Sequence, residues 1–361
     1  MASKVFLART ADQRDPETLA QIARKLFEAA GLDRVVREND LVGVKLHFGE
    51  GGNRNPIPIP VVREIVAALA QRGAKPFLTE TSTLYRGMRQ NAVDHTRMIL
   101  DHGYTLEATG APIVMLDGLL GESQVDVPIG GKHYEKVKVA TGARALHALV
   151  GIAHITGHPA AGFGGQIKNV GMGMSSRGGK LMQHSGIEPQ VDKAKCRACG
   201  ACVEWCPTGA AQFDQDGKAV IIRAKCIGCG QCFSVCPEGA IPFNWAGSAS
   251  AMQEKMAEHV LGVIKGKENK VAFINFAVRM TRNCDCGNKP KPEDPALPDL
   301  GILASDDPVA LDKATYDLIC QQAGRDPFRQ FYPDVDPTVQ MRHAAAIGAG
   351  SLEYQLQEIT A

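Results

Sequence analysis

The sequence predicts an α/β protein with a mostly parallel sheet and flanking helices, interrupted by a small cysteine-rich module. Short apolar runs alternate with amphipathic stretches along the first 190 residues, which is typical of chains that build parallel sheets. The same alternation resumes after residue 245, and two copies of a cysteine motif lie between the two parts. We therefore expect an α/β domain in two parts, 1–190 and 246–361, with a module inserted over 191–245.

Apolar runs and helix-start signals define the elements of the first part. Strands are predicted at 4–9, 41–48, 75–80, 112–116 and 148–158. Asp15 followed by Pro16 begins a helix that ends at Gly31. A second helix begins at Pro60, and a third covers 91–102. Two alternating runs within 124–139 predict a hairpin.

The second part repeats these signals. A helix is predicted over 252–264, followed by a strand over 270–278. A further strand leads into a helix with Asp307 as its N-cap and Pro308 at its first position. The most glycine-dense segment of the chain, 157–180, is predicted to be a loop.

Composition excludes several classes of partner. Lys and Arg total 40 and Asp and Glu total 39, so no global charge attracts nucleic acid or an anionic membrane. No stretch approaches the ~18 apolar residues of a membrane span, and no signal peptide is recognisable. We expect a cytoplasmic protein. Its eleven cysteines then indicate metal or redox chemistry rather than disulfides.

Eight of these cysteines form the duplicated motif. "CRACGACVEWCP" (196–207) and "CIGCGQCFSVCP" (226–237) both read C-x2-C-x2-C-x3-C-P, the pattern of a bacterial-type ferredoxin, a small α+β domain with two 4Fe–4S clusters. In that pattern the fourth cysteine of each copy ligates the other cluster. The predicted ligand sets are Cys196, Cys199, Cys202 and Cys236 for one cluster, and Cys226, Cys229, Cys232 and Cys206 for the other. Zinc is the alternative, but one zinc ion would need only four of the eight.

The rest of the chain resembles a known family. "VGVKLHFGEGGNRNPIP", "TETSTLYRGMRQNAVDH", "GFGGQIKNVGMGMSSRGGKLMQHSG" and "FINFAVRMTRNCDC", together with the cysteine motifs, are similar to the uncharacterised iron–sulfur centre proteins. The resemblance covers nearly the whole chain and implies an α/β domain of unknown function with a ferredoxin-type insert. It implies no reaction. The segment "VKLHF…NPIP" is also similar to the start of the nickel-pincer lactate racemases.

Basic residues near strand ends predict an anion site. Lys168, Arg177 and Lys180 lie among the glycines of 157–180, where backbone amides can approach a ligand closely. Arg86 follows another strand end and could clamp an anion or pair with a surface acid. Loops that follow buried strands are the usual ligand crevice of α/β sheets, so we expect these residues to bind a cofactor or substrate. The alternative is that the segment 157–180 only packs against the inserted module.

Two histidines and two cysteines are the candidate catalytic groups. His47 and His158 follow buried strands, where either could act as a general acid or be a structural histidine. Cys284 and Cys286 follow another strand, with Arg279 and Arg282 nearby. This pair could bind an additional metal, react as thiols or have no role, whereas Cys320 lies on an apolar helix face and is predicted to be structural.

These features favour an iron–sulfur oxidoreductase. Ferredoxin or another low-potential partner would exchange electrons with the two clusters, and the clusters would reduce a small, anionic substrate in the α/β crevice. One alternative is a non-catalytic electron-transfer or metal-handling accessory protein, and a second is a racemase- or lyase-like enzyme with structural clusters. The enzyme hypothesis gains support if the Cys284/Cys286 loop, the glycine-rich segment and one cluster border the same pocket, and it fails if Cys284 and Cys286 face open solvent far from both clusters.

Overall fold

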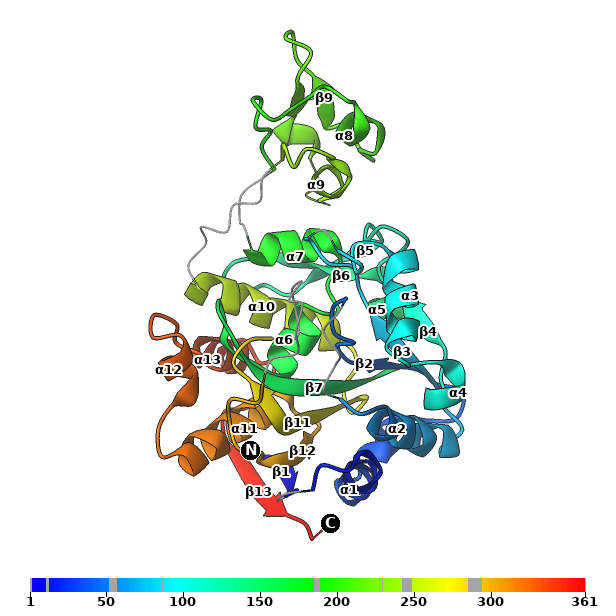
Figure 1. The fold of residues 1–361 in the computed structure, drawn as a ribbon, viewed down its shortest axis with the longest axis vertical. Coiled ribbons are helices and arrows are strands. Elements are labelled where there is room, and N and C mark those ends of the chain that lie inside the picture. The colour runs from blue at the N-terminus through cyan, green and yellow to red at the C-terminus, as the bar shows by residue number, and fades with distance from the viewer. Residues whose placement is uncertain are drawn as a thin grey trace.

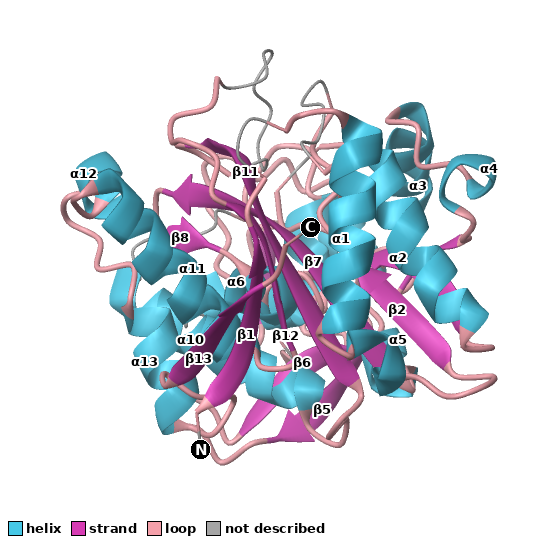
Figure 2. Cartoon of the chain, turned by 90° about the horizontal axis from the view of Figure 1, so that it is seen from below, coloured by secondary structure: helices cyan, strands magenta, loops and turns pink. Residues whose placement is uncertain are grey.

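The computed structural model describes residues 2–10, 13–51, 57–85, 87–184, 189–226, 228, 230–241, 249–284 and 294–360. Within these ranges, nine strands form one large sheet that carries helices on both faces (Figures 1 and 2). The small sheet of the cysteine-rich segment lies apart from the large sheet, at the top of Figure 1.

The strands of the large sheet come from both ends of the chain. They are β1 (Ser3–Ala8), β2 (Leu41–Lys45), β3 (Lys75–Glu80), β4 (Ile113–Met115), β7 (Ala148–His158), β8 (Gly162–Gly164), β11 (Val271–Thr281), β12 (Gly301–Ser305) and β13 (Tyr354–Glu358). Their order is β13-β1-β12-β11-β7-β2-β3-β4, and β8 pairs with β7 outside this order. β12 is antiparallel to both of its neighbours and β8 is antiparallel to β7, while the remaining pairs are parallel. The sheet is therefore mixed but mostly parallel, as the sequence predicts.

Two further pairs of strands and the helices complete the architecture. The pairs are β5 (Gln124–Pro128) with β6 (Lys136–Ala140), and β9 (Ala211–Phe213) with β10 (Ala219–Ile221). The helices are α1 (Pro16–Ala29), α2 (Ile59–Gln71), α3 (Ala92–Asp101), α4 (Leu106–Thr109), α5 (Thr141–Ala145), α6 (Gln166–Gly171), α7 (Arg177–His184), α8 (Ala201–Glu204), α9 (Gln231–Val235), α10 (Ala249–Ile264), α11 (Pro308–Ala323), α12 (Pro327–Phe331) and α13 (Val339–Ala346), with 3-10 turns η1 (Leu32–Val35) and η2 (Arg223–Lys225).

The predicted helix starts have the expected capping geometry. The Asp15 carboxylate accepts a hydrogen bond from the backbone N–H of Thr18 at 2.8 Å, with Pro16 as the first residue of α1. The Asp307 carboxylate accepts from the N–H groups of Val309 and Ala310 at the start of α11. These caps satisfy backbone donors that have no partner within the helix.

Each face of the sheet has its own apolar core. Residues of the central strand β7 alternate between the two: Val150 packs with the core of α1 and α2, while Leu149 packs with that of α6, α10 and α11. Ten of the eleven residues of β7 are buried. A strand buried on both faces is continuously apolar, which explains why this run was recognisable in the sequence.

The glycine-rich segment 157–180 is not the predicted loop. It contains β8, α6 and the beginning of α7. Its glycines allow close packing: a methyl group at Gly171 would lie 2.4 Å from the carbonyl oxygen of Met256, and one at Gly179 would lie 2.1 Å from that of Lys138. The glycine density therefore reflects tightly packed short helices rather than an irregular loop.

The cysteine-rich segment forms a small α+β unit. β9 and β10 pair as antiparallel strands, and α8 and α9 each begin within one copy of the cysteine motif. Its buried residues form a separate apolar cluster that includes Cys196, Cys202, Cys232 and Cys236. The large sheet is formed by strands that precede and follow this unit in the sequence. No helix in the described ranges is long and apolar enough to cross a bilayer.

Candidate functional site

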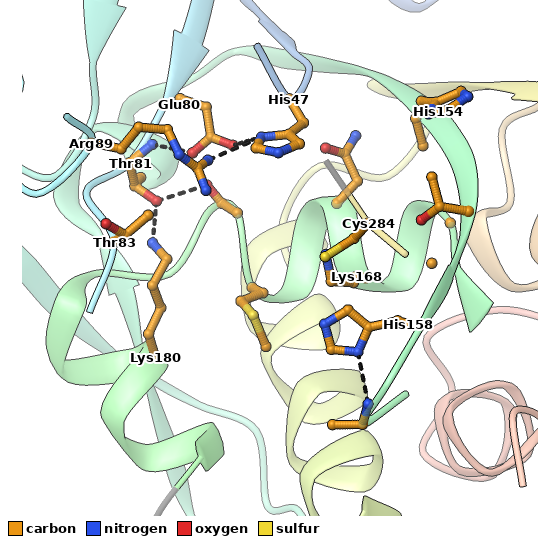
Figure 3. A pocket seen from close by; sticks show the side chains of 18 of the residues that line it. His47, Glu80, Thr81, Thr83, Arg89, His154, His158, Lys168, Lys180 and Cys284 are labelled. Atoms are coloured by element: carbon orange, nitrogen blue, oxygen red, sulfur yellow. Dashed lines mark hydrogen bonds and ion pairs between the residues drawn. The ribbon is translucent and has the colours of Figure 1, made fainter. Parts of the chain in front are cut away.

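A cavity of about 400 Å³ opens at the carboxyl ends of the parallel strands (Figure 3). It is lined by Lys45 at the end of β2, Glu80 at the end of β3, His158 at the end of β7 and Cys284 beyond β11. Parallel strands of an open α/β sheet bring residues from distant parts of the sequence to one edge in this way. This volume is in the usual range for a small-molecule site.

Most of the predicted site residues meet in this cavity. Five of them line it: His47, His158, Lys168, Lys180 and Cys284. Arg86 and Cys286 lie outside the described residues. Arg177 is not among the lining residues, and its guanidinium donates to the Thr83 carbonyl instead.

A buried ion pair between Lys45 and Glu80 forms part of the cavity wall. The Lys45 ammonium donates to Glu80 Oε1 at 2.7 Å and to Asn169 Oδ1 at 2.9 Å. Burial opposes ionisation of Glu80, but the charges of Lys45 and Arg89 outweigh it and lower the pKa of that carboxyl to about 2. Glu80 is therefore a carboxylate at neutral pH, and its charge is already compensated by protein groups.

Arg89 organises a second buried network beside this pair. Its guanidinium donates from Nε to Glu50 Oε2 at 2.9 Å and also contacts the Tyr85 hydroxyl. A third nitrogen lies 3.0 Å from His47 Nδ1. Because arginine only donates hydrogen bonds, Nδ1 of His47 must accept, and the ring hydrogen of the neutral imidazole lies on Nε2.

His158 is held in the same tautomer by the backbone. Its Nδ1 accepts hydrogen bonds from the N–H groups of Ala160 at 3.1 Å and Ala161 at 3.0 Å. The ring hydrogen of the neutral side chain is therefore also on Nε2. The cavity thus contains two histidines that can each donate a hydrogen bond from Nε2.

Lys180 is a buried cation of the cavity wall whose hydrogen-bond partners are neutral. Its ammonium contacts the Thr81 hydroxyl and donates to the Ser175 carbonyl at 2.8 Å, and no carboxylate of the described residues lies within ion-pair distance. Burial lowers the pKa of Lys180 to about 8, although the more distant Asp117 opposes the shift. The ammonium is therefore charged at neutral pH and lacks a direct counter-ion.

The charges on the cavity wall favour an anion. Among the described lining residues, Lys45, Lys168, Lys180 and Arg89 are basic, whereas Glu80 is acidic. Figure 3 shows Lys180 and Arg89 on one side of the cavity and His158 on the other. Lys45 and Arg89 were not predicted as site residues. Their buried partners, Glu80 and Glu50, come from other segments of the chain, so the sequence gives no local signal for them.

The cysteines outside the duplicated motif have different surroundings. Cys284 is half-buried in the cavity wall. Cys320 is half-buried against the apolar core, and burial raises the pKa of its thiol to about 11, as expected of an unreactive structural cysteine. No group of three or more His, Cys, Asp or Glu side chains in the described part of the chain could hold a single metal ion.

The cysteine motifs form a second candidate site. Cys196, Cys199, Cys202 and Cys236, which are the four members of one predicted ligand set, line the same small cavity. Of the other set, Cys206, Cys226 and Cys232 are described, and Cys229 is not. The fourth cysteine of the second motif thus joins the first three of the first motif, which is the exchange that the sequence pattern predicts.

The two motifs also repeat each other in backbone geometry. Positive φ angles recur 30 residues apart, at Ala198 and Gly228, at Gly200 and Gly230, and at Gly209 and Gly239. The N–H of Ala210 donates to Cys206 Sγ and that of Ala240 donates to Cys236 Sγ, both at 3.2 Å. Backbone donors directed at sulfur stabilise thiolate ligands, so the four cysteines of the first set fit an iron–sulfur cluster.

The second motif borders the wall of the large cavity. A methyl group at Gly230 would lie 3.3 Å from Arg177 Cγ and 3.8 Å from Leu84 Cδ2. Leu84 itself lines the cavity. Leu84 therefore lies between the second cysteine motif and the cavity that Lys180, His47 and Cys284 line.

Comparison with known families and structures places the chain in a family. Residues 42–317 match the family described as a domain of unknown function, DUF362. The chain belongs to this family. No curated protein matches it. The description of this family names no activity.

Two solved structures align with parts of the chain. One is the lactate racemase apoprotein from Thermoanaerobacterium thermosaccharolyticum, with 12% sequence identity and a TM-score of 0.37 over 76% of this chain and 50% of that protein. The other is a Thermotoga maritima protein, with 11% identity and a TM-score of 0.42 over 86% of this chain and 59% of that protein. The chain thus aligns with only half to three-fifths of their length. Similarity at this level carries no argument about activity.

Proposed function

We propose that this DUF362 protein is an iron–sulfur oxidoreductase that passes single electrons through two 4Fe–4S clusters to a small anionic substrate. The observation that carries the proposal is the position of Leu84, which lines the basic cavity and also packs against Gly230 of the second cysteine motif. A ligand site and a cluster-binding motif that share one wall are suited to electron transfer between them.

The cluster ligands would be the eight cysteines of the duplicated motif. Cys196, Cys199, Cys202 and Cys236 would hold one cluster, and Cys226, Cys229, Cys232 and Cys206 the other, within a module over 191–245. A single zinc ion draws its thiolates to about 2.3 Å from its centre. When bound, each cluster supplies one electron at a time.

The substrate would be held by the basic and imidazole groups of the cavity wall. Lys180 has neutral hydrogen-bond partners, so a carboxylate or phosphate oxygen would complete its coordination. His47 and His158, each held in place through Nδ1, would lie beside the substrate. Lys168 adds a further positive charge to the cavity wall.

Electrons would come from ferredoxin or another low-potential partner. In the first motif, Cys199 and Arg197 are exposed, whereas the second motif contacts the α/β domain through Gly230. An external donor therefore has access to the first cluster site. The role of Cys284 in the cavity stays a prediction, either as a metal ligand or as a reactive thiol.

A single-turnover experiment tests this proposal. Anaerobically purified protein is reduced with dithionite, freed of excess reductant and mixed with a panel of small carboxylates and phosphate esters, while cluster absorbance is followed. We expect at least one compound to reoxidise the clusters. Lys180→Met should slow this at least 100-fold with unchanged iron content, because the variant lacks a buried ammonium whose hydrogen-bond partners are neutral. Lys132→Met, at an exposed surface lysine, is the matched control.

Two outcomes would contradict the proposal. One is reoxidation at the wild-type rate in Lys180→Met, which would separate electron transfer from the cavity. The other is a compound that exchanges its hydrogen with solvent deuterium in the wild type without any change in the clusters, which would indicate racemase- or lyase-like chemistry.

A further inference from the structure

Arg177 is a buried arginine at the contact between the α/β domain and the second cysteine motif. Its side chain is 1% exposed, and its backbone N–H donates to the Gly121 carbonyl at 3.0 Å. Its guanidinium donates from Nε to the Thr83 carbonyl at 3.3 Å and also contacts the Gln90 carbonyl. The aliphatic part of the side chain packs on Gly230. Arg177 is thus fixed in place and does not line the cavity.

The charge of Arg177 has a consequence for the neighbouring motif. Gly230 lies between Cys229 and Cys232, two members of the second predicted ligand set. A guanidinium keeps its positive charge at every accessible pH, and a buried charge is poorly screened by water. Reduction adds negative charge to a cluster, so a fixed positive charge beside it stabilises the reduced form.

We propose that Arg177 raises the reduction potential of the cluster held by Cys206, Cys226, Cys229 and Cys232. The proposal rests on the proposed function, because it assumes that both clusters are bound. Arg177 then acts as a positioning residue for electrons: it stabilises the reduced form of the cluster whose motif contacts the cavity wall.

The first motif has basic neighbours of a different kind, and Lys218 donates a hydrogen bond from its ammonium to the Cys196 carbonyl at 2.6 Å. Arg197 follows Cys196 directly, but its side chain is 77% exposed and lies 3.4 Å from the Glu238 carboxylate. Water and the paired carboxylate both weaken its effect on a cluster. Arg197 is therefore a matched control, with the same charge and a comparable place in the sequence motif but a different burial.

The test is a redox titration of the anaerobic holoprotein monitored by electron paramagnetic resonance. Arg177→Gln should reduce the equilibrium constant for reduction of one cluster by about tenfold, which is about 59 mV for a one-electron couple. Arg177→Lys, which retains the charge, should restore most of the potential, and Arg197→Gln should leave both potentials unchanged. A Cys199→Ala background, which removes one ligand of the first set, identifies which signal belongs to which cluster.

Several results would overturn the proposal. The proposal would be contradicted if the second cluster had the same reduction potential in the wild type and in Arg177→Gln. A shift confined to the first cluster would also contradict it. If Arg177→Gln does not retain its iron, Arg177→Met keeps the aliphatic stem on Gly230 and serves the same comparison. Loss of the second cluster from the Gln, Met and Lys variants alike would assign Arg177 a structural role instead. A wild-type protein without iron would refute the proposed function itself, so the two failures are distinguishable.

Discussion

At the scale of single residues, the site depends on how buried charges are compensated. Lys45 is neutralised by Glu80, and Arg89 by Glu50, so neither needs a ligand to balance its charge. Lys180 differs because its partners are a hydroxyl and a carbonyl oxygen. The cavity is therefore prepared for an anion at one particular ammonium group rather than by a diffuse positive field.

The protonation of Lys180 predicts how anion binding depends on pH. Burial lowers the pKa of Lys180 to about 8, so the ammonium is present below that pH and is lost above it. We expect the affinity for oxalate, which does not titrate between pH 6 and 10, to be constant near pH 6–7. Above pH 8 it should fall by up to about tenfold per unit, as expected when binding requires one proton. Isothermal titration calorimetry measures this directly.

Lys180→Met provides the control for this pH dependence. The variant should bind oxalate weakly and without the decline above pH 8. An unchanged decline in Lys180→Met would show that another group, such as Lys45, controls anion binding.

At the scale of elements, close packing of short helices positions the charged groups. Gly171 of α6 packs against α10 and Gly179 of α7 packs against β6, while Gly173 lies between α6 and α7 against Lys45. Strand ends and helix caps could be predicted from the sequence because apolar periodicity and Asp-Pro signals are local. The structure of 157–180 could not, because it depends on contacts such as Gly171 with Met256, which are distant in the sequence.

Gly173 offers a test of this packing. A methyl group there would lie 2.3 Å from the Asn169 carbonyl oxygen and 2.5 Å from Lys45 Cε. We expect Gly173→Ala to lower the free energy of unfolding by about 1–3 kcal/mol through overpacking, and to weaken oxalate binding because Lys45 and Asn169 must move. Thermal unfolding and calorimetry measure the two effects.

Gly348→Ala is the comparison for Gly173→Ala. Nothing lies within 4 Å of the added methyl group at Gly348, but the backbone φ is +79°, so a cost of about 1–2 kcal/mol arises from backbone strain alone. Oxalate binding should be unchanged in this variant. Wild-type stability and oxalate affinity in Gly173→Ala would contradict the packing account.

At the scale of the whole molecule, a mostly parallel α/β sheet and a small cysteine-rich unit meet at one wall of a cavity. The sequence predicted five of the lining residues, because the ends of parallel strands converge. It did not predict Lys45 and Arg89 as site residues, since their partners come from separate segments: Glu80 is 35 residues from Lys45, and Asn169 is 124 residues away. The contact between Gly230 and Arg177 likewise depends on tertiary packing.

The central claim is that the duplicated motif binds two 4Fe–4S clusters, and metal analysis of the anaerobically purified chain tests it most directly. We predict about eight iron and eight sulfide per wild-type chain, unchanged in Cys284→Ser, with loss of one cluster in Cys196→Ser or Cys226→Ser. One or two zinc ions per chain with no sulfide, or full iron in the Cys196 and Cys226 variants, would contradict the claim.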